Sequence, residues 1–161
     1  SEAIEYAVKN FGNRNLQFIT SDAECYNSGK YDLIVSFETL EHLDRRQMFL
    51  SNLCTMLRND GMLIISTPNK AITSPMKSPQ KIRNKYHKYE YTQEEIITAL
   101  QEAGFREILK FGQHPYPRIF SNQLISRLLR RRFNKDILQT AEVLPYSNKT
   151  MPRYFVFAAT K

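Results

Sequence analysis

The stretch 31-YDLIVSFETLEHLD-44 joins an apolar run directly to a group of acidic and imidazole side chains. Residues 33–37 are apolar except for Ser36, which predicts a buried strand. Glu38, Glu41 and His42 follow at once, and the spacing i, i+3, i+4 would place all three on one side of a helical turn. The stretch therefore predicts a polar site at the end of a core strand.

The segments around this stretch predict an α/β domain. Helices are expected over 1–11, 44–59 and 92–103, with a turn at 59–61, and a basic amphipathic helix over 122–133. Strands are expected over 16–20, 31–37, 62–66, 105–111 and 153–160. Apolar strands that alternate with amphipathic helices indicate a parallel sheet covered by helices on both faces. The last two strands could pair antiparallel at its edge.

Composition and charge narrow the classes of function. The chain of 161 residues allows one domain with a core, and no apolar run approaches the roughly 20 residues that span a bilayer. Cys25 and Cys54 lie far apart, without metal-ligand spacing, and predict free thiols in a reducing compartment. The net charge is +7, and two segments without acids, 70–89 and 112–135, hold six Lys or Arg residues each. These segments are either solvated surface or a surface for an anionic partner.

Three motifs in order resemble one family. "YDLIVSFETLEHL", then "LRNDGMLIISTPN", then "YTQEEIITALQEAGF" resembles the C-terminal two-thirds of a class I S-adenosylmethionine-dependent methyltransferase of the small-molecule type 11 group. The resemblance implies a Rossmann-like α/β fold with a mostly parallel sheet and an antiparallel last strand. It also implies a single methyltransferase domain over 1–161, with basic insertions at 70–89 and 112–150, and S-adenosylmethionine as cofactor.

The departure from the family lies at the N-terminal side. The family has a glycine-rich turn that holds the methionine part of the cofactor, and an acid that holds its ribose. The chain has five glycines and no G-x-G pattern. We therefore expect an N-terminally incomplete domain, either a fragment or a degenerate relative, with strands missing between 16–20 and 31–37. Unpaired strand edges would then allow self-association.

Three residues are candidates for cofactor binding by resemblance. Asp22 matches the acid that accepts a hydrogen bond from the adenine amino group, and the backbone N–H of Ala23 would serve a ring nitrogen. Phe37 matches the residue that walls the cofactor pocket at a strand end. The alternatives are a loop or capping role for Asp22 and a core role for Phe37.

Three further residues are candidates for catalysis: Glu38, His42 and His87. Histidine titrates near neutral pH and could accept a proton from an attacking hydroxyl. Quinone O-methyltransferases that share the E-x-x-E-H pattern use it for magnesium, but we assign no metal ligand here. The alternatives are that Glu41 and His42 start the next helix and pair with arginines, and that His87 packs among the tyrosines of its loop.

The function expected from the resemblance is methyl transfer to an oxygen or nitrogen of a small acceptor that is anionic or linked to a lipid or sugar. We expect the protein in the cytoplasm, with peripheral contact at the inner membrane surface as one option. The alternative is a non-catalytic binding module that keeps a basic surface for an anionic partner. Nucleic acid is not the favoured partner, because no RNA-binding signature occurs in the chain.

Overall fold

A computed structural model describes residues 2–74, 82–117, 143–145 and 150–161. Its helices are α1 Glu2–Phe11, the 3₁₀ helix η1 Leu40–His42, α2 Arg46–Met56, α3 Lys70–Thr73 and α4 Gln93–Glu102. Its strands are β1 Tyr31–Ser36, β2 Leu57–Pro68, β3 Ile108–Pro117, β4 Val143–Pro145 and β5 Thr150–Thr160.

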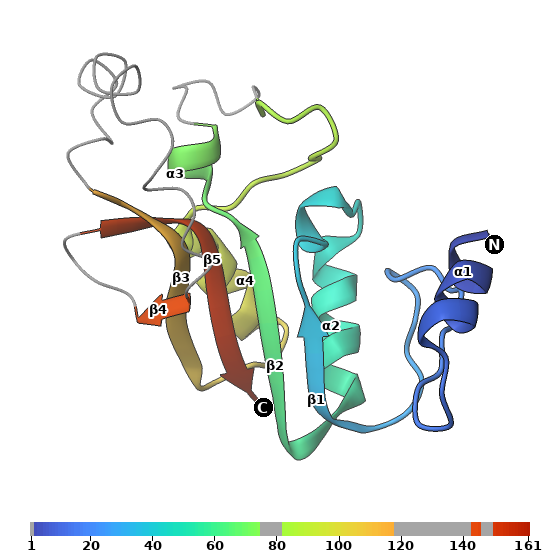
Figure 1. Cartoon of the computed structure of the whole chain (residues 1–161). Helices are drawn as coiled ribbons and strands as arrows, with labels where there is room; N and C mark the ends of the chain where they lie inside the picture. Colours follow the sequence, from blue (N-terminus) through green and yellow to red (C-terminus); the bar gives the residue numbers. More distant parts are fainter. Residues whose placement is uncertain (1, 75–81, 118–142, 146–149) are drawn as a thin grey trace.

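The five strands form one mixed sheet in the order β1-β2-β5-β3-β4. β1 and β2 pair in parallel, β5 pairs antiparallel with both β2 and β3, and β4 pairs antiparallel with β3. β1, β2 and β3 therefore run in the same direction, and their carboxyl ends lie at the same end of the sheet (Figure 1). In open α/β sheets, ligands bind at the carboxyl ends of the strands.

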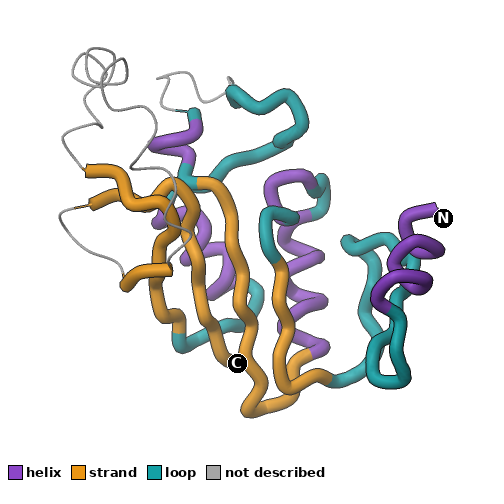
Figure 2. Tube along the Cα trace, in the orientation of Figure 1, coloured by secondary structure: helices purple, strands orange, loops and turns teal. Residues whose placement is uncertain are grey.

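The core lies between the sheet and two helices. α2 and α4 cover one face of the strands, as the purple and orange segments of Figure 2 show. The buried residues of this layer come from α2, α4, the inward positions of β2 and β5, and the segment between α4 and β3; they include Leu50, Leu53, Leu63, Ile65, Ile96, Leu100, Phe105, Phe155 and Phe157. α4 agrees with the helix expected over 92–103; it begins at a full capping box between Thr92 and Glu95, and Gly104 follows its end with φ of 105°.

The opposite face of β1 and β2 has no cover among the described residues. Leu33, Val35 and Phe37 alternate along the strand toward this face and are all exposed. α1 lies beyond the β1 edge, away from α2 and α4 (Figure 1), and buries none of its residues. The expectation of a sheet covered on both faces is therefore wrong for the part of the chain that the structure describes.

Two local predictions were wrong. Residues 16–20 form no strand: Leu16 makes only an isolated bridge with Asn13, and no described strand offers it a ladder of hydrogen bonds. Residues 59–61 are not a turn either, because β2 begins directly after α2 at Leu57. A side chain at Gly61 would be crowded, since a Cβ at this position would lie 3.0 Å from the carbonyl oxygen of Tyr31.

The predicted antiparallel pairing of the last long strands is confirmed, with one difference. β5 lies inside the sheet, between β2 and β3, rather than at its edge. The predicted basic helix over 122–133 falls outside the described residues. No helix in the described segments is long and apolar enough to cross a membrane.

Candidate active site

The end of β1 leads into the polar site through a strained residue. Glu38 has φ of 48°, a left-handed conformation that non-glycine residues seldom adopt. Its backbone N–H donates to the Ser66 hydroxyl (3.1 Å), and that hydroxyl donates to Glu38 Oε1 (2.8 Å). Because Ser66 lies near the carboxyl end of β2, the two parallel strands together hold the Glu38 carboxyl group.

Glu38 is poised to exchange a proton near neutral pH. Desolvation of the carboxyl group raises the pKa of Glu38 to about 7; the Ser66 hydrogen bond opposes this rise and the neighbouring Glu41 carboxyl adds to it. The residue as a whole is exposed, although its carboxyl group turns back onto the buried Ser66. A carboxyl group in such a setting is suited to general acid–base chemistry.

Glu41 is fully buried at the centre of the site. Neither oxygen of its carboxyl group has a hydrogen-bond partner among the described residues, and His42 Nε2 lies 3.9 Å from Oε1. Burial raises the pKa of the Glu41 carboxyl group, against the opposing effect of the two nearby histidines. Its backbone carbonyl accepts from the N–H groups of Lys88 (2.7 Å) and Tyr89 (3.2 Å). η1 therefore anchors the loop that carries His87.

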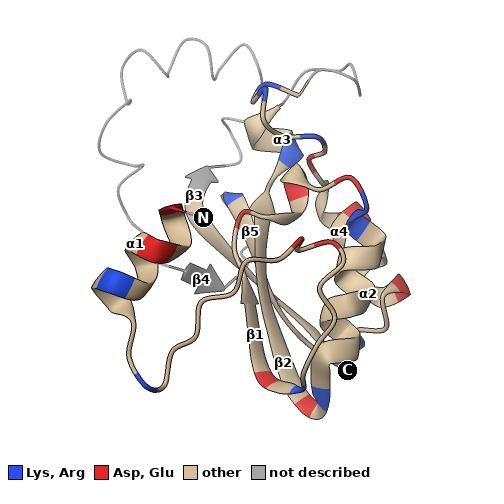
Figure 3. Cartoon of the chain, turned by 90° about the vertical axis from the view of Figure 1, so that its right-hand side faces the viewer, with Lys and Arg blue, Asp and Glu red and all other residues tan. Residues whose placement is uncertain are grey.

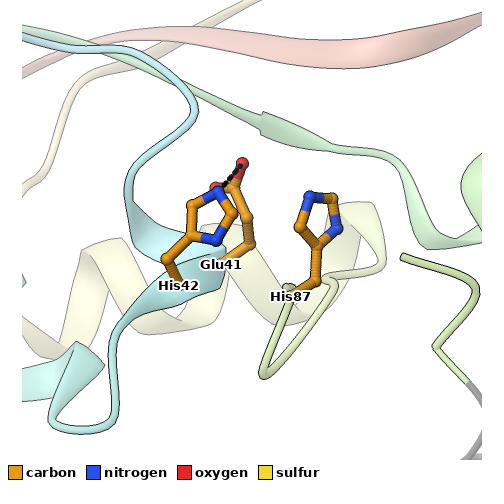
Figure 4. Close-up of side chains that lie close together, drawn as sticks. All are labelled: Glu41, His42 and His87. Carbon is orange, nitrogen blue, oxygen red and sulfur yellow. Dashed lines mark ion pairs between the residues drawn. The ribbon is translucent and has the colours of Figure 1, made fainter. Parts of the chain in front are cut away.

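His87 enters the site from that loop. Its ring meets the ring of His42 edge-on at a centroid distance of 5.0 Å, and His42 Nδ1 donates to the Tyr86 carbonyl (2.9 Å). Figure 4 shows Glu41 and His42 projecting from the turn after β1 and His87 facing them from the loop. The predicted catalytic residues His42 and His87, 45 positions apart in the chain, are brought together. We call Glu38, Glu41, His42 and His87 the polar cluster.

Three members of the polar cluster could hold a divalent cation. One ligand atom each of Glu41, His42 and His87 lies within 4.8 Å of the others. Two imidazoles and one carboxylate suit a transition metal better than magnesium, which prefers oxygen ligands. Both ring nitrogens of His87 are already occupied, however, by Glu90 Oε1 (2.7 Å) and Asn84 Nδ2 (2.8 Å). One of these bonds must break before His87 can bind a metal.

The predicted cofactor residues lie on a more open part of the surface. Phe37 is 58% exposed at the end of β1. Asp22 and Ala23 lie in a turn in which Asp22 Oδ1 accepts from the Glu24 N–H (2.9 Å) and Oδ2 accepts from Arg45 Nη2 (3.2 Å). The carboxylate of Asp22 remains exposed and has lone pairs to spare for a further donor.

Glu24, which the sequence did not single out, fixes that turn. Its carboxylate accepts from Arg45 Nε (2.7 Å) and from the backbone N–H of Arg45 (3.2 Å), and its carbonyl accepts from Asn52 Nδ2 (3.0 Å). The bond from the Arg45 side chain is the main cause that lowers the pKa of Glu24. An acid before a turn is a common pattern, so only the tertiary contact with α2 reveals this role.

Comparison with known proteins places the chain among methyltransferases. A family profile described as "Methyltransferase domain" matches residues 3–110. A probable S-adenosylmethionine-dependent methyltransferase of Mycobacterium tuberculosis is 32% identical over 88 residues, which are 55% of this chain and 31% of that protein. A ubiquinone biosynthesis O-methyltransferase of Rickettsia akari is 36% identical over 69 residues, which are 42% of this chain and 27% of that protein. The chain thus spans about a third of the length of the curated relatives it matches.

Solved structures agree on the fold. An S-adenosylmethionine-dependent methyltransferase of Thermotoga maritima, possibly a histamine N-methyltransferase, aligns with a TM-score of 0.61 and 16% identity, over 89% of this chain and 62% of its own. One from Clostridium acetobutylicum aligns with a TM-score of 0.60 and 13% identity, over 99% and 71%. The Rossmann-like expectation is confirmed, and S-adenosylmethionine is the cofactor that the family and these relatives indicate.

The chemistry of the predicted cofactor residues is compatible with one side of that cofactor. The exposed ring of Phe37 would suit an apolar wall, and the free lone pairs of Asp22 would suit a donor such as an adenine amino group. The methionine side needs a glycine-rich turn, and the sequence of this chain contains no G-x-G pattern.

Proposed function

Because the chain belongs to the methyltransferase-domain family, we propose that the protein in which it occurs methylates a hydroxyl group of a small anionic acceptor. The observation that carries the proposal is the meeting of Glu38, Glu41, His42 and His87 at the carboxyl ends of β1 and β2. A hydroxyl acceptor must lose a proton as it is methylated, and this cluster holds groups that can take one.

Each member of the polar cluster has a different part in this proposal. S-adenosylmethionine supplies an electrophilic methyl group when it is bound. His87 accepts the proton of the acceptor hydroxyl, and Glu38, with its pKa near 7, is the second proton acceptor. Glu41 keeps the loop in place through its backbone carbonyl and places a carboxyl group beside the two imidazoles. Phe37 and Asp22 form the adenine side of the cofactor site.

A proton acceptor is favoured over a metal ligand for His87 by its hydrogen bonds. Its two ring nitrogens are engaged within the protein, which orients the ring without any ion. The two roles make different predictions for the full-length protein. We expect methyl transfer to persist after EDTA treatment and to gain less than about twofold from added Mg²⁺ or Mn²⁺. Loss of activity with EDTA and recovery with one metal would replace the proton-acceptor role by a metal site.

The anionic character of the acceptor rests on charge and topology. Arg83 and Lys85 are exposed on the loop between β2 and α4, and β2 and β3 end at the same side of the sheet. Lys88 is neutralised by an ion pair with Asp44, so the described part of segment 70–89 is less basic than its sequence suggests. Figure 3 shows acidic and basic positions close together there. Lys70, in α3, lies over the ring of Tyr89. The other basic residues of the two segments, Lys77, Lys81 and those of 118–135, fall outside the described residues.

A lipid- or sugar-linked anion would also fit this proposal. The protein would then act in the cytoplasm, at the inner membrane surface where such an acceptor is exposed. Self-association through the exposed β1 edge stays a prediction for the chain in solution.

The proposal is tested by product formation in the full-length protein. S-adenosylhomocysteine release is measured with 3,4-dihydroxybenzoate, an anionic diol, and with its neutral methyl ester. We expect turnover of the anion, with a lower KM than for the ester. His87→Gln should lower kcat about 10²-fold, whereas His114→Gln, a histidine that contacts Tyr154 on β5, should lower it less than threefold.

Two results would overturn the proposal. Unchanged turnover in His87→Gln would remove this residue from catalysis. Binding of the anion without any S-adenosylhomocysteine release, across a panel of hydroxyl acceptors, would instead support the non-catalytic binding module.

A further inference from the structure

A second buried acid, Glu90, lies behind His87. It is 1% exposed, its Oε1 lies 2.7 Å from His87 Nδ1, and its Oε2 accepts from the Thr73 hydroxyl (2.6 Å). The sequence marks Glu90 only as one acid among tyrosines in "YHKYEYT". Its burial and two short contacts set it apart from Glu94 and Glu95 of α4, which lie nearer the surface.

The hydrogen bonds around His87 determine where its proton is. An ionised carboxylate only accepts, so the contact with Glu90 requires a proton on Nδ1. On the other side, the Tyr86 N–H donates to Asn84 Oδ1 (3.1 Å), which turns the Nδ2 group of Asn84 toward His87 Nε2 at 2.8 Å. An NH₂ group only donates, so Nε2 must carry a lone pair. Two independent contacts therefore select the same neutral tautomer.

We propose that Glu90 is a positioning residue that holds the proton of His87 on Nδ1 and so leaves Nε2 as the proton-accepting nitrogen. In this arrangement Asn84 occupies Nε2 in the free protein, and the hydroxyl of the acceptor displaces the Asn84 amide when it binds. The proposal rests on the proposed function for its catalytic meaning, since it assigns the nitrogen through which His87 would act. It names a residue outside the polar cluster that acts only through His87.

The surroundings of Glu90 make this role specific. Thr73 is the last residue of α3, and its hydroxyl also lies 2.9 Å from the carbonyl of Asn69, the N-cap residue of the same helix. Asn69 in turn donates from Nδ2 to the Pro152 carbonyl at the start of β5 (2.8 Å). Glu90 is therefore connected through Thr73 and Asn69 to the end of β2 and to β5. A group held in this way can fix a ring orientation as well as a tautomer.

The contacts predict how two substitutions will differ. Glu90→Gln keeps an oxygen that can accept from Nδ1–H, and its NH₂ group can donate to the Thr73 hydroxyl, which then donates to the Asn69 carbonyl. Glu90→Leu removes both partners. A positioning role therefore predicts rescue by Gln, whereas a role that needs the negative charge predicts that both variants fail.

The first experiment is an NMR measurement of the His87 tautomer from its ring ¹⁵N shifts, which needs no variant. We expect the Nδ1–H tautomer in the wild-type chain and in Glu90→Gln, and a shift toward Nε2–H in Glu90→Leu. Glu94→Leu, an exposed acid in the first turn of α4, is the control and should change nothing. An Nε2–H tautomer in the wild type, or an unchanged Nδ1–H tautomer in Glu90→Leu, would overturn the proposal.

The second experiment measures methyl transfer in the full-length protein. Glu90→Leu should lower kcat about 10- to 100-fold with little change in the KM for S-adenosylmethionine, and Glu90→Gln should stay within about threefold of the wild type. Equal losses in both variants would contradict a positioning role. If His87→Gln is fully active while the tautomer results are as expected, the proposed function fails and the structural role of Glu90 remains.

Discussion

Phe37 and Glu38 are neighbours in the chain, yet they belong to two different surfaces. The surface at Glu38 is packed and hydrogen-bonded, whereas the surface at Phe37 is open among the described residues. On the side that we propose for the acceptor, called the acceptor side below, Glu38 meets Ser66, Glu41 is fully buried, and His87 is fixed by hydrogen bonds at both ring nitrogens. On the side that we propose for the cofactor, the cofactor side, Phe37 is exposed and the sheet face around it has no cover among the described residues. The comparison teaches that the two halves of a site can depend on different parts of a sequence.

The reason for the difference is the source of the contacts. The acceptor side is built by β1, β2, η1 and the loop before α4, all of which lie within residues 31–91. The cofactor side needs partners along the free edge of β1, and α1 and residues 12–30 supply no strand there. Polar groups that satisfy one another locally can be held in place even where a neighbouring apolar surface stays open.

The largest expected effect concerns cofactor affinity. We expect the 161-residue chain to bind S-adenosylmethionine with a Kd above about 1 mM, because only the adenine side of the site is present. Titration calorimetry with the chain at 25 °C measures this directly. A Kd in the micromolar range would contradict the difference between the two sides, since the cofactor side would then be as complete as the acceptor side.

The next largest effect separates the two sides within the full-length protein. Phe37→Ala should raise the KM for S-adenosylmethionine about tenfold, because it removes an aromatic wall worth roughly 1–3 kcal/mol. The KM for the acceptor should change less than twofold. Leu109→Ala, an equally exposed apolar residue on β3, serves as the control and should leave both values unchanged. A larger change in the KM for the acceptor than in the KM for S-adenosylmethionine would show that Phe37 belongs to the acceptor side instead.

On the acceptor side, the buried Glu41 carboxyl group should make the free energy of unfolding depend on pH. Burial raises the pKa of Glu41 in the folded state, so the folded protein binds a proton at this residue more tightly than the unfolded chain does. The free energy of unfolding therefore falls as pH rises through the window between the unfolded and the folded pKa of Glu41. Glu41→Gln should therefore gain stability relative to the wild type between pH 4 and pH 8, by about 1–3 kcal/mol. Urea unfolding at several pH values measures this gain.

Glu95 provides a control of opposite sign. Although burial opposes its ionisation, the backbone N–H of Thr92 helps to lower the pKa of the Glu95 carboxyl group. Its stabilising contribution is present above the unfolded pKa and is lost as pH falls. Glu95→Gln should therefore lose stability relative to the wild type as pH rises through the acidic range to the ordinary pKa of about 4.5, with little further change at higher pH. The same sign for both variants would contradict the assignment of Glu41 as a destabilised buried acid.

The smallest expected effect concerns the basic loop. Arg83→Glu combined with Lys85→Glu should raise the KM for 3,4-dihydroxybenzoate about threefold at low salt, because exposed charges interact weakly through water. The effect should shrink at high salt, and the KM for S-adenosylmethionine should not change. Lys9→Glu with Arg14→Glu changes the charge equally at the N-terminal end. An equal rise in that control would show a response to net charge alone.

Much of the part of the fold in which α2 and α4 pack on the sheet was predictable from the sequence. α4 lies within the helix expected over 92–103, the run at 31–37 extends one residue past β1, and the run at 62–66 lies within β2. These signals are local, because capping and strand propensity depend on nearby residues. The strand at 16–20 was mispredicted for the converse reason: a strand exists only if a partner pairs with it.

The features of the candidate site can also be separated into those that are local in the sequence and those that depend on tertiary contacts. The sequence by itself determined that carboxylates and an imidazole follow β1, that Phe37 ends an apolar run, and that no glycine-rich turn occurs in the chain. The folded structure was needed to show that His87 faces His42 and that Glu24 and Glu90 hold other residues in place. It was also needed to show that the buried Glu41 carboxyl group has no hydrogen-bond partner in the part of the chain that is described. These facts depend on which segments the β-sheet brings together. The contact of Glu24 with Arg45 spans 21 residues of chain, and His42 and His87 are 45 positions apart, so neither leaves a local pattern from which it could be predicted. Glu90 lies only three residues from His87, but its burial and its bond with Thr73 depend on the packing of the loop against α3.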